Sequence, residues 1–504
     1  MTLDEVMTVA NGGSVELTKE ALDLIGRSRA VVDAAIDRGD AVYGVTTGVG
    51  HARNERLPME ALSEMQPILV EMHLGAMGEP LAVELVRAGM VVRLNGFARG
   101  GAGVSIEVAQ ALEALINNHI HPVIPRSGSV GSGDLGQLAY LGRTLLGRGE
   151  VEWRGDQVSA QVALRQSGLA PVSFRPKDAL AVISSNALTI GHGIALCRSV
   201  GRLLSLADLV AATSMEAIAA NPSFFDPAVS RVRHSAGQEE TSRILREALA
   251  GSSRVDPAVA SVQDPISFRV VPQVHGACRD VLARVTTDLE EELNAKSDNP
   301  LVDIESERVL SNGNFHAMNV ALSTEALNLS LAHLGLLSER RCGQLWDAAV
   351  ASLGETMGGD SGSGPPPGEA SPPFLAGLAL RYPAAARYTR LRQLAQPVTL
   401  DVPPLDLSVE DHATNAAEAL WVTEEIVAMV AEILVVEALI AFARLSTSPG
   451  GGPLGALTEK LVDVVSREMA SLPVGSLPDE THARVSRALT FNLEEILAGG
   501  KPPG

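Results

Sequence analysis

The sequence predicts an all-α protein built as a bundle of long helices. Apolar residues recur at three- and four-residue spacing over long stretches, whereas strict alternation of apolar and polar residues is nearly absent. A composition of 46% hydrophobic and 20% charged residues over 504 positions supplies enough apolar material for a large buried core. Several stretches exceed the mean helix length of globular proteins, which favours a long-helix bundle.

The predicted helices follow one another along the chain and are separated by glycine-rich, polar loops. Only two short segments are strand-like, Glu150–Trp153 and Leu301–Asp303. The helices that the periodicity predicts are Glu20–Arg38, Leu81–Leu94, Ser105–Asn117, Ala179–Met215, Val281–Leu293, Asn319–Leu345 and Asn415–Phe442. The loops between them are Tyr43–Asn54, Gly100–Val104, Arg126–Leu138, Asp256–Val274 and Ser311–Met318. Loops on a rigid scaffold are where functional residues usually lie.

Breaks in the helical pattern along the chain predict three consecutive segments. Residues 1–180 form an N-terminal domain, residues 181–445 a central long-helix bundle and residues 446–504 a C-terminal helical segment. Within the central segment, residues 358–373 read GGDSGSGPPPGEASPP, a composition typical of a flexible hinge or a surface insertion.

Charge and cysteine usage exclude several classes of partner. The formal net charge of −20 repels phosphate backbones, and 3% aromatic residues offer few platforms for base stacking, so nucleic-acid binding is disfavoured. The cysteines Cys197, Cys278 and Cys342 are far apart, which predicts neither a disulfide framework nor a zinc site. The N-terminus does not resemble a signal peptide, and the apolar runs are interrupted by charges. We therefore expect a cytoplasmic protein without a metal, a nucleotide or a membrane span.

The segment Gly128–Gly136, which reads GSVGSGDLG, places a glycine on each side of Ser132. Such a turn is compatible with an ordinary helix N-cap near Asp134. A phosphate-binding loop would carry a lysine, and a nucleophile elbow would follow a strand, so both are disfavoured. A fourth interpretation is chemical: when the glycine nitrogen attacks the carbonyl two residues earlier and water is lost, Xaa-Ser-Gly becomes a methylidene-imidazolone electrophile.

Further motifs follow in order along the chain. They are Tyr43–Gly50 (YGVTTGVG), Arg93–Asn95 with Gly100–Gly103, Gln263–Arg269 (QDPISFR), Ser297–Leu301 with Ser311–His316, Ser338–Arg341 and Glu410–His412 (EDH). Together with the Gly-Ser-Gly loop, the chain from about Tyr43 to His412 resembles the aromatic amino acid ammonia-lyases, most closely histidine ammonia-lyase. That family also includes the phenylalanine and tyrosine lyases and the aminomutases.

The resemblance implies a reaction, a prosthetic group and a set of site residues. It implies an all-α homotetramer that eliminates the amine of an aromatic or imidazole amino acid, at a site assembled from several chains. It also implies a methylidene-imidazolone formed from the chain itself, since an electron-withdrawing electrophile assists loss of both the carbon-bound proton and the amine. The implied catalytic residues are Tyr43 as the base, Gly131, Ser132 and Gly133 as the cyclising triad, and Asn186 beside it. The implied substrate-binding residues are His73, Gln263, Arg269 for the carboxylate, Phe315, and Glu410 for an imidazole N–H.

The chain also departs from the family pattern. Its loop is one residue shorter, so that Gly131 stands in place of the family's alanine, and Ile266 occupies the position of a second tyrosine. Each motif alone has an ordinary interpretation; Arg269, for example, is compatible with a structural ion pair. Two alternatives therefore stay open. One is a family scaffold without the electrophile that uses Tyr43 and Arg269 for another elimination, addition or cyclisation on a carboxylated substrate. The other is a non-catalytic paralogue.

Overall fold

The computed structural model describes residues 1–256, 261–357, 376–400, 402–447, 451–473 and 476–498. Its contacts divide the chain into two compact units. The first unit comprises Met1–Cys197, Val285–Glu325 and Pro397–Trp421, and the second comprises Arg198–Arg284, Ala326–Gln396 and Val422–Gly504. This grouping is discontinuous along the chain, so the consecutive segments 1–180, 181–445 and 446–504 stay a prediction. The insertion 358–373 lies outside the described residues.

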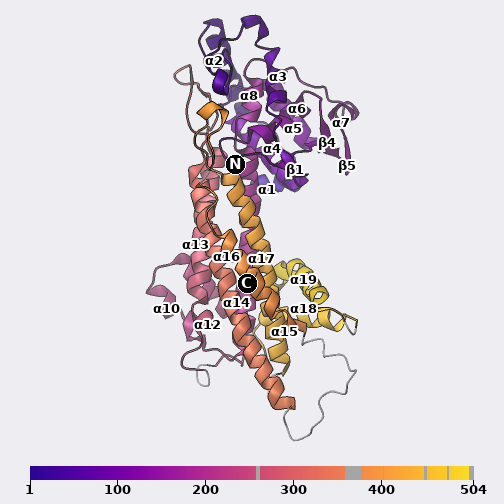
Figure 1. Ribbon diagram of the computed structural model, residues 1–504, viewed down its shortest axis with the longest axis vertical. Helices are drawn as coiled ribbons and strands as arrows, with labels where there is room; N and C mark the ends of the chain where they lie inside the picture. The colour runs from indigo at the N-terminus through magenta and orange to yellow at the C-terminus, as the bar shows by residue number, and fades with distance from the viewer. Residues whose placement is uncertain (257–260, 358–375, 401, 448–450, 474–475, 499–504) are drawn as a thin grey trace. The chain divides into compact units, whose positions relative to one another are not determined.

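Helices dominate the described residues, and the strands have only two to four residues, which confirms the all-α class (Figure 1). The helices of the first unit are α1 (Leu3–Ala10), α2 (Lys19–Asp37), α3 (Met65–Met72), α4 (Val83–Ala98), α5 (Ile106–Asn117), α6 (Leu135–Leu145), α7 (Ala160–Gln166) and α8 (Asp178–Ile183). Those of the second unit are α10 (Pro227–Arg231), α11 (Ala236–Ala248), α12 (Ile266–Arg269), α15 (Ala376–Ala379), α16 (Arg381–Leu394), α18 (Thr458–Ala470) and α19 (Pro478–Ala498). Four long helices contribute residues to both units: α9 (Ala187–Ala217), α13 (Val271–Asn294), α14 (Met318–Met357) and α17 (Ala416–Thr447).

The strands form three small antiparallel sheets in the first unit. Both predicted strand segments are found, as β4 (Glu150–Trp153) and β6 (Leu301–Asp303). Strand β4 lies between β2 (His121–Pro122) and β5 (Asp156–Ser159), and β6 pairs with β7 (Arg308–Leu310). A further pair, β1 (Met77–Pro80) with β3 (Pro125–Ser127), was not predicted and leads into the Gly-Ser-Gly loop.

Three of the predicted helix boundaries are wrong. Helix α14 ends at Met357, twelve positions after the predicted end at Leu345. The predicted helix Ala179–Met215 is two helices, α8 and α9, separated at Ser184–Asn186. Helix α13 begins at Val271, ten positions before the predicted start at Val281, within a segment expected to be a loop. In the latter two places neighbouring elements contribute hydrogen bonds that the local sequence pattern does not encode. One example is the bond from the Asp134 amide to the Ser185 carbonyl (2.7 Å).

Apolar packing stabilises the interior of the first unit, and a buried ion pair that of the second. In the first unit, Val31, Val32 and Ala35 of α2 form a cluster with Val42, Val45 and Val302. In the second unit, the carboxylate of Glu437 on α17 accepts hydrogen bonds from Ser214 and Ser338 (2.6 Å each) and pairs with Arg341 (2.6 and 2.9 Å). Glu437 and Arg341 have fully buried side chains, so the long helices α9, α14 and α17 share one buried charge pair.

Three helical stretches are long and apolar enough to cross a membrane by length and composition alone: Asp178–Ala217, Met318–Ala351 and Ala416–Thr447. The most apolar windows of these stretches are, respectively, 83%, 61% and 67% buried inside the protein. Most of their apolar surface is therefore used in the core, as expected for helices that are hydrophobic over most of their circumference.

Candidate active site

The Gly-Ser-Gly loop connects strand β3 to helix α6. Gly131 has φ +87° and Gly133 has φ +97°, backbone conformations that residues with a side chain rarely adopt. The Ser129 hydroxyl accepts a hydrogen bond from the Gly131 amide (3.2 Å), which tightens the turn. The loop therefore folds sharply around Ser132, as the sequence predicts.

The segment before helix α17 fastens this loop. The Thr414 hydroxyl donates to the Gly131 carbonyl (2.9 Å), and the Asn415 amide donates to the Val130 carbonyl (2.8 Å). A Cβ atom on Gly131 would lie 2.1 Å from the Thr414 Oγ1 atom and 2.6 Å from the Asn415 nitrogen. The position consequently has no room for the alanine that the family carries there.

Asn186 occupies the break between α8 and α9 and joins two parts of the site. Its Oδ1 atom accepts from the Gly133 amide (3.1 Å), and its Nδ2 atom donates to the Phe315 carbonyl (2.6 Å). Behind it, the fully buried Asp134 accepts two hydrogen bonds from Thr189 (2.7 and 2.9 Å). Burial raises the pKa of the Asp134 carboxyl group, and the Thr189 hydrogen bonds oppose that shift.

Tyr43 lies in the turn that follows α2, and its phenolic oxygen accepts a hydrogen bond from the Gly50 amide (3.1 Å). Burial raises the pKa of Tyr43, as do the negative charges of Glu410 and Asp406, while the Gly50 hydrogen bond and Arg53 oppose the shift. In this structure the surroundings of Tyr43 favour the phenol over the phenolate that a base requires.

His73 and Glu410 lie close enough to influence each other electrostatically. His73 follows the last residue of α3, and its Nδ1 atom donates to the Leu69 carbonyl (2.7 Å), which leaves Nε2 as the acceptor nitrogen of the neutral ring. Burial, and then Asp406, raise the pKa of Glu410, whereas the positive charge that His73 carries when its ring is protonated lowers it. Because Glu410 also raises the pKa of Tyr43, it lies within electrostatic range of both Tyr43 and His73, and we call these three residues the tyrosine cluster.

The remaining two predicted residues belong to the second unit. Arg269 ends the short helix α12, and its Nε atom is buried without a hydrogen-bond partner in the described part of the chain. Gln263 is exposed, and so is Ile266, at 63%. Arg269 therefore has hydrogen-bonding capacity that the described residues leave unused.

Sequence reasoning missed the residues that position this cluster. Asp406 accepts from the His51 amide (2.8 Å) and pairs with its Nδ1 atom (2.7 Å), which links the Tyr43 loop to the segment carrying Glu410. Asp406, Leu407 and Ser408 all have positive φ angles of 46–64°. No glycine marks this turn in the sequence, so the pattern contained no signal for it.

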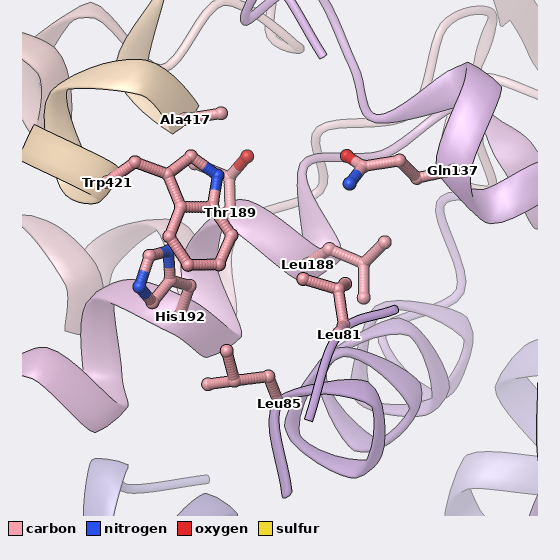
Figure 2. Close-up of a pocket in the computed structure, with 8 residues that line it drawn as sticks. All are labelled: Leu81, Leu85, Gln137, Leu188, Thr189, His192, Ala417 and Trp421. Carbon is pink, nitrogen blue, oxygen red and sulfur yellow. The ribbon is translucent and has the colours of Figure 1, made fainter. Parts of the chain in front are cut away.

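A small pocket lies next to Thr189 in the first unit (Figure 2). Trp421 and His192 lie against each other on one side, with ring centroids 4.0 Å apart, and Gln137 lies on the other. Leu81, Leu85, Leu188 and Ala417 complete an apolar lining. Among the described residues, no group of three or more His, Cys, Asp or Glu side chains could hold a metal ion.

Residues 1–467 match the family described as aromatic amino acid lyase. The chain belongs to this family. Histidine ammonia-lyase of Symbiobacterium thermophilum is 34% identical over 449 residues, which cover 88% of this chain and 86% of that protein. Histidine ammonia-lyase of Anaeromyxobacter dehalogenans is 34% identical over 98% of this chain and 96% of its own length.

Solved structures of aromatic amino acid lyases and related enzymes share the fold. Histidine ammonia-lyase from Trypanosoma cruzi superposes with a TM-score of 0.85 at 26% identity, over 100% of this chain and 94% of that one. Tyrosine aminomutase from Streptomyces globisporus gives 0.87 at 25% identity over 100% and 98%. Ergothionase from Treponema denticola gives 0.90 at 24% identity over 99% and 98%, a likeness of fold alone. The protein is a carbon–nitrogen lyase.

Proposed function

We propose that this lyase eliminates the amine from an aromatic or imidazole amino acid, with a histidine-like substrate as the best fit. The observation that carries the proposal is the cluster of Tyr43, His73 and Glu410, together with the hydrogen bond from the Ser132 hydroxyl to the carbonyl of His412, two positions after Glu410 (3.4 Å). The 34% identity to histidine ammonia-lyases over most of the chain supports the same substrate class.

The cluster has groups suited to each part of such a substrate. The Glu410 carboxylate is an acceptor for an imidazole N–H, and the Nε2 atom of His73 is a second acceptor. The phenolic oxygen of Tyr43 is the candidate base for the carbon-bound proton. The guanidinium of Arg269 matches a substrate carboxylate bidentately, and its unpartnered Nε atom is consistent with that use. We propose that these groups come together in a homotetramer, supported by the exposed leucines Leu322 (55%) and Leu329 (52%) on α14.

The loop contains the atoms that a methylidene-imidazolone requires. Ring closure would join the Gly133 nitrogen to the Gly131 carbonyl carbon, with loss of one water from that step and one from the Ser132 side chain. The Thr414 hydroxyl donates a hydrogen bond to the Gly131 carbonyl, and the Asn186 Oδ1 atom accepts one from the Gly133 amide. The carbonyl that is attacked and the nitrogen that attacks it therefore both have hydrogen-bond partners that favour ring closure. The residues therefore fit the group. When present, it supplies an electrophile that withdraws electrons from the substrate.

Intact-mass measurement of the purified full-length protein tests the prosthetic group. We expect a deficit of two water molecules relative to the sequence, abolished in Ser132→Ala. The matched control Ser63→Ala, at an exposed serine of the same unit, retains the deficit. A full-length mass without any deficit, in protein that releases ammonia from an amino acid, would contradict the cyclised triad.

A second candidate is favoured by one observation, the absence of space for a methyl group at Gly131 in a loop one residue shorter than in the family. It is a lyase scaffold without the electrophile, which uses Tyr43 and Arg269 for another elimination, addition or cyclisation on a carboxylated substrate. It predicts an unmodified Ser132 together with an activity that is lost in Tyr43→Phe. A cytoplasmic location also remains a proposal, to be checked by cell fractionation.

A further inference from the structure

Two histidines far apart in the sequence form a direct pair in the first unit. His316 precedes helix α14 and His412 precedes helix α17. The His316 Nε2 atom lies 2.9 Å from the His412 Nδ1 atom, and the ring centroids are 5.0 Å apart. His316 is half-buried and His412 is exposed, so one ring faces the protein and the other reaches solvent.

The segments that carry the two histidines are hydrogen-bonded to the Gly-Ser-Gly loop, one directly and the other through Asn186. The His412 carbonyl accepts a hydrogen bond from the Ser132 hydroxyl (3.4 Å). The carbonyl of Phe315, one residue before His316, accepts from Asn186, which in turn holds the Gly133 amide. The pair therefore borders the turn at which the proposed chemistry takes place.

The distance between the two nitrogens indicates that a proton lies between them. Two bare imidazole nitrogens repel at 2.9 Å, so one proton must lie between them, donated by one ring to the other. A second added proton would place two cationic rings in contact. Burial, and then the charge of His412, lower the pKa of His316. Glu410 and Asp411 directly precede His412 and are the nearest acidic residues along its own segment.

We propose that His316 and His412 form a proton-sharing pair that acts as the general acid for the leaving amine. This role rests on the proposed amine elimination. The base removes the carbon-bound proton, the carbon–nitrogen bonding electrons go to nitrogen, and the pair donates one proton to that nitrogen. The products are an alkene and a free amine, and the pair regains its proton from water through the exposed His412.

The chemistry of this site requires such a donor. An amine leaves poorly unless its nitrogen is protonated as the bond breaks. The resemblance places a tyrosine at the position of Ile266, and an isoleucine side chain has no proton to give. The histidine pair supplies two imidazole rings, each of which can donate and accept a proton.

The first arm of the test needs no substrate. Full-length protein with ¹⁵N-labelled histidine is titrated by NMR, alongside His412→Gln and the matched control His234→Asn at an exposed histidine of the second unit. In wild-type protein we expect His316 and His412 to titrate together, and in His412→Gln we expect the midpoint of His316 to move to higher pH. Independent titration of the two rings in wild-type protein would overturn the shared proton.

The second arm measures ammonia release from L-histidine as the probe, as a function of pH. In His412→Gln we expect kcat to fall about a hundredfold with KM little changed, the alkaline limb of the kcat profile to move, and free imidazole to restore part of the rate. His234→Asn retains the wild-type profile. An unmoved alkaline limb in both His412→Gln and His316→Gln would overturn the role as an acid.

The two arms separate the failure of this inference from that of the proposed function. A wild-type protein that releases no ammonia from any aromatic or imidazole amino acid, yet titrates His316 and His412 jointly, refutes the proposed function and the acid role while leaving the proton-sharing pair established. Normal ammonia release with independent titration and unchanged pH profiles refutes the pair alone.

Discussion

Gly131→Ala restores the residue that the family carries and is predicted to destabilise this protein. The new Cβ would lie 2.1 Å from the Thr414 Oγ1 atom and 2.6 Å from the Asn415 nitrogen, and one of these contacts is with backbone. Overpacking of this kind costs about 1–3 kcal/mol. Loss of the Thr414–Gly131 hydrogen bond costs about 1 kcal/mol, and a side chain at φ +87° costs about 1–2 kcal/mol. The free energy of unfolding should therefore fall by roughly 3–6 kcal/mol.

Gly155→Ala is the matched control because it separates backbone strain from the clash. Gly155 also has φ +87°, but no heavy atom lies within 4 Å of its Cβ position. Only the strain of about 1–2 kcal/mol should appear there. Hydrogen exchange at the Asn415 amide, which donates to Val130, gives a local measurement alongside thermal denaturation. Gly131→Ala should lose about 2 kcal/mol or more of stability beyond this strain. If the Asn415 amide exchanges by local opening, that loss should speed its exchange about 30-fold. If the two variants had equal effects on stability and exchange, the conclusion that Thr414 and Asn415 hold the loop in place would be wrong.

Two further predictions concern charge in the two units. Burial lowers the pKa of His121, so its contribution to stability should be fully present above the unfolded pKa of about 6.5 and be lost as the pH falls from there through the lower folded pKa. His121→Gln removes the titrating group and should flatten that part of a Tm–pH curve. Glu437→Gln should lower the free energy of unfolding by about 3–5 kcal/mol because it leaves Arg341 buried and uncompensated. The exposed control Glu240→Gln should cost at most about 1 kcal/mol, and a similar loss in both would contradict the buried pair.

The long helices could be predicted because their apolar spacing is set by burial within the protein. The two short strands at Glu150–Trp153 and Leu301–Asp303 could also be predicted, since both stand out from a helical background. The break at Ser184–Asn186 could not, because no glycine or proline marks it. It depends on the Asp134 amide bonding the Ser185 carbonyl, a contact across some fifty positions of the chain.

The candidate site likewise contains residues that the sequence could predict and residues that it could not. The sequence and the resemblance identify Tyr43, the Gly-Ser-Gly loop and Glu410, because each lies in a recognisable local motif. The residues that fasten them do not lie in one. Asp406 and His51 are 355 positions apart, and Thr414 reaches Gly131 across 283. Their types, an aspartate, a histidine and a threonine in polar loops, are unremarkable until the chain is folded.

The charges around Tyr43 favour a substrate that carries positive charge. As the protein stands, burial, and to a smaller extent the charges of Glu410 and Asp406, raise the pKa of the phenol, which favours the protonated form of the group proposed as the base. A cationic or hydrogen-bond-donating nitrogen bound at Glu410 would offset that carboxylate and so lower the pKa of Tyr43, because a positive charge stabilises the phenolate. The base would then become active only with the substrate in place. An imidazole amino acid provides such a nitrogen on its ring, whereas a phenyl side chain does not, and this difference supports the proposal of a histidine-like substrate rather than a phenylalanine-like one.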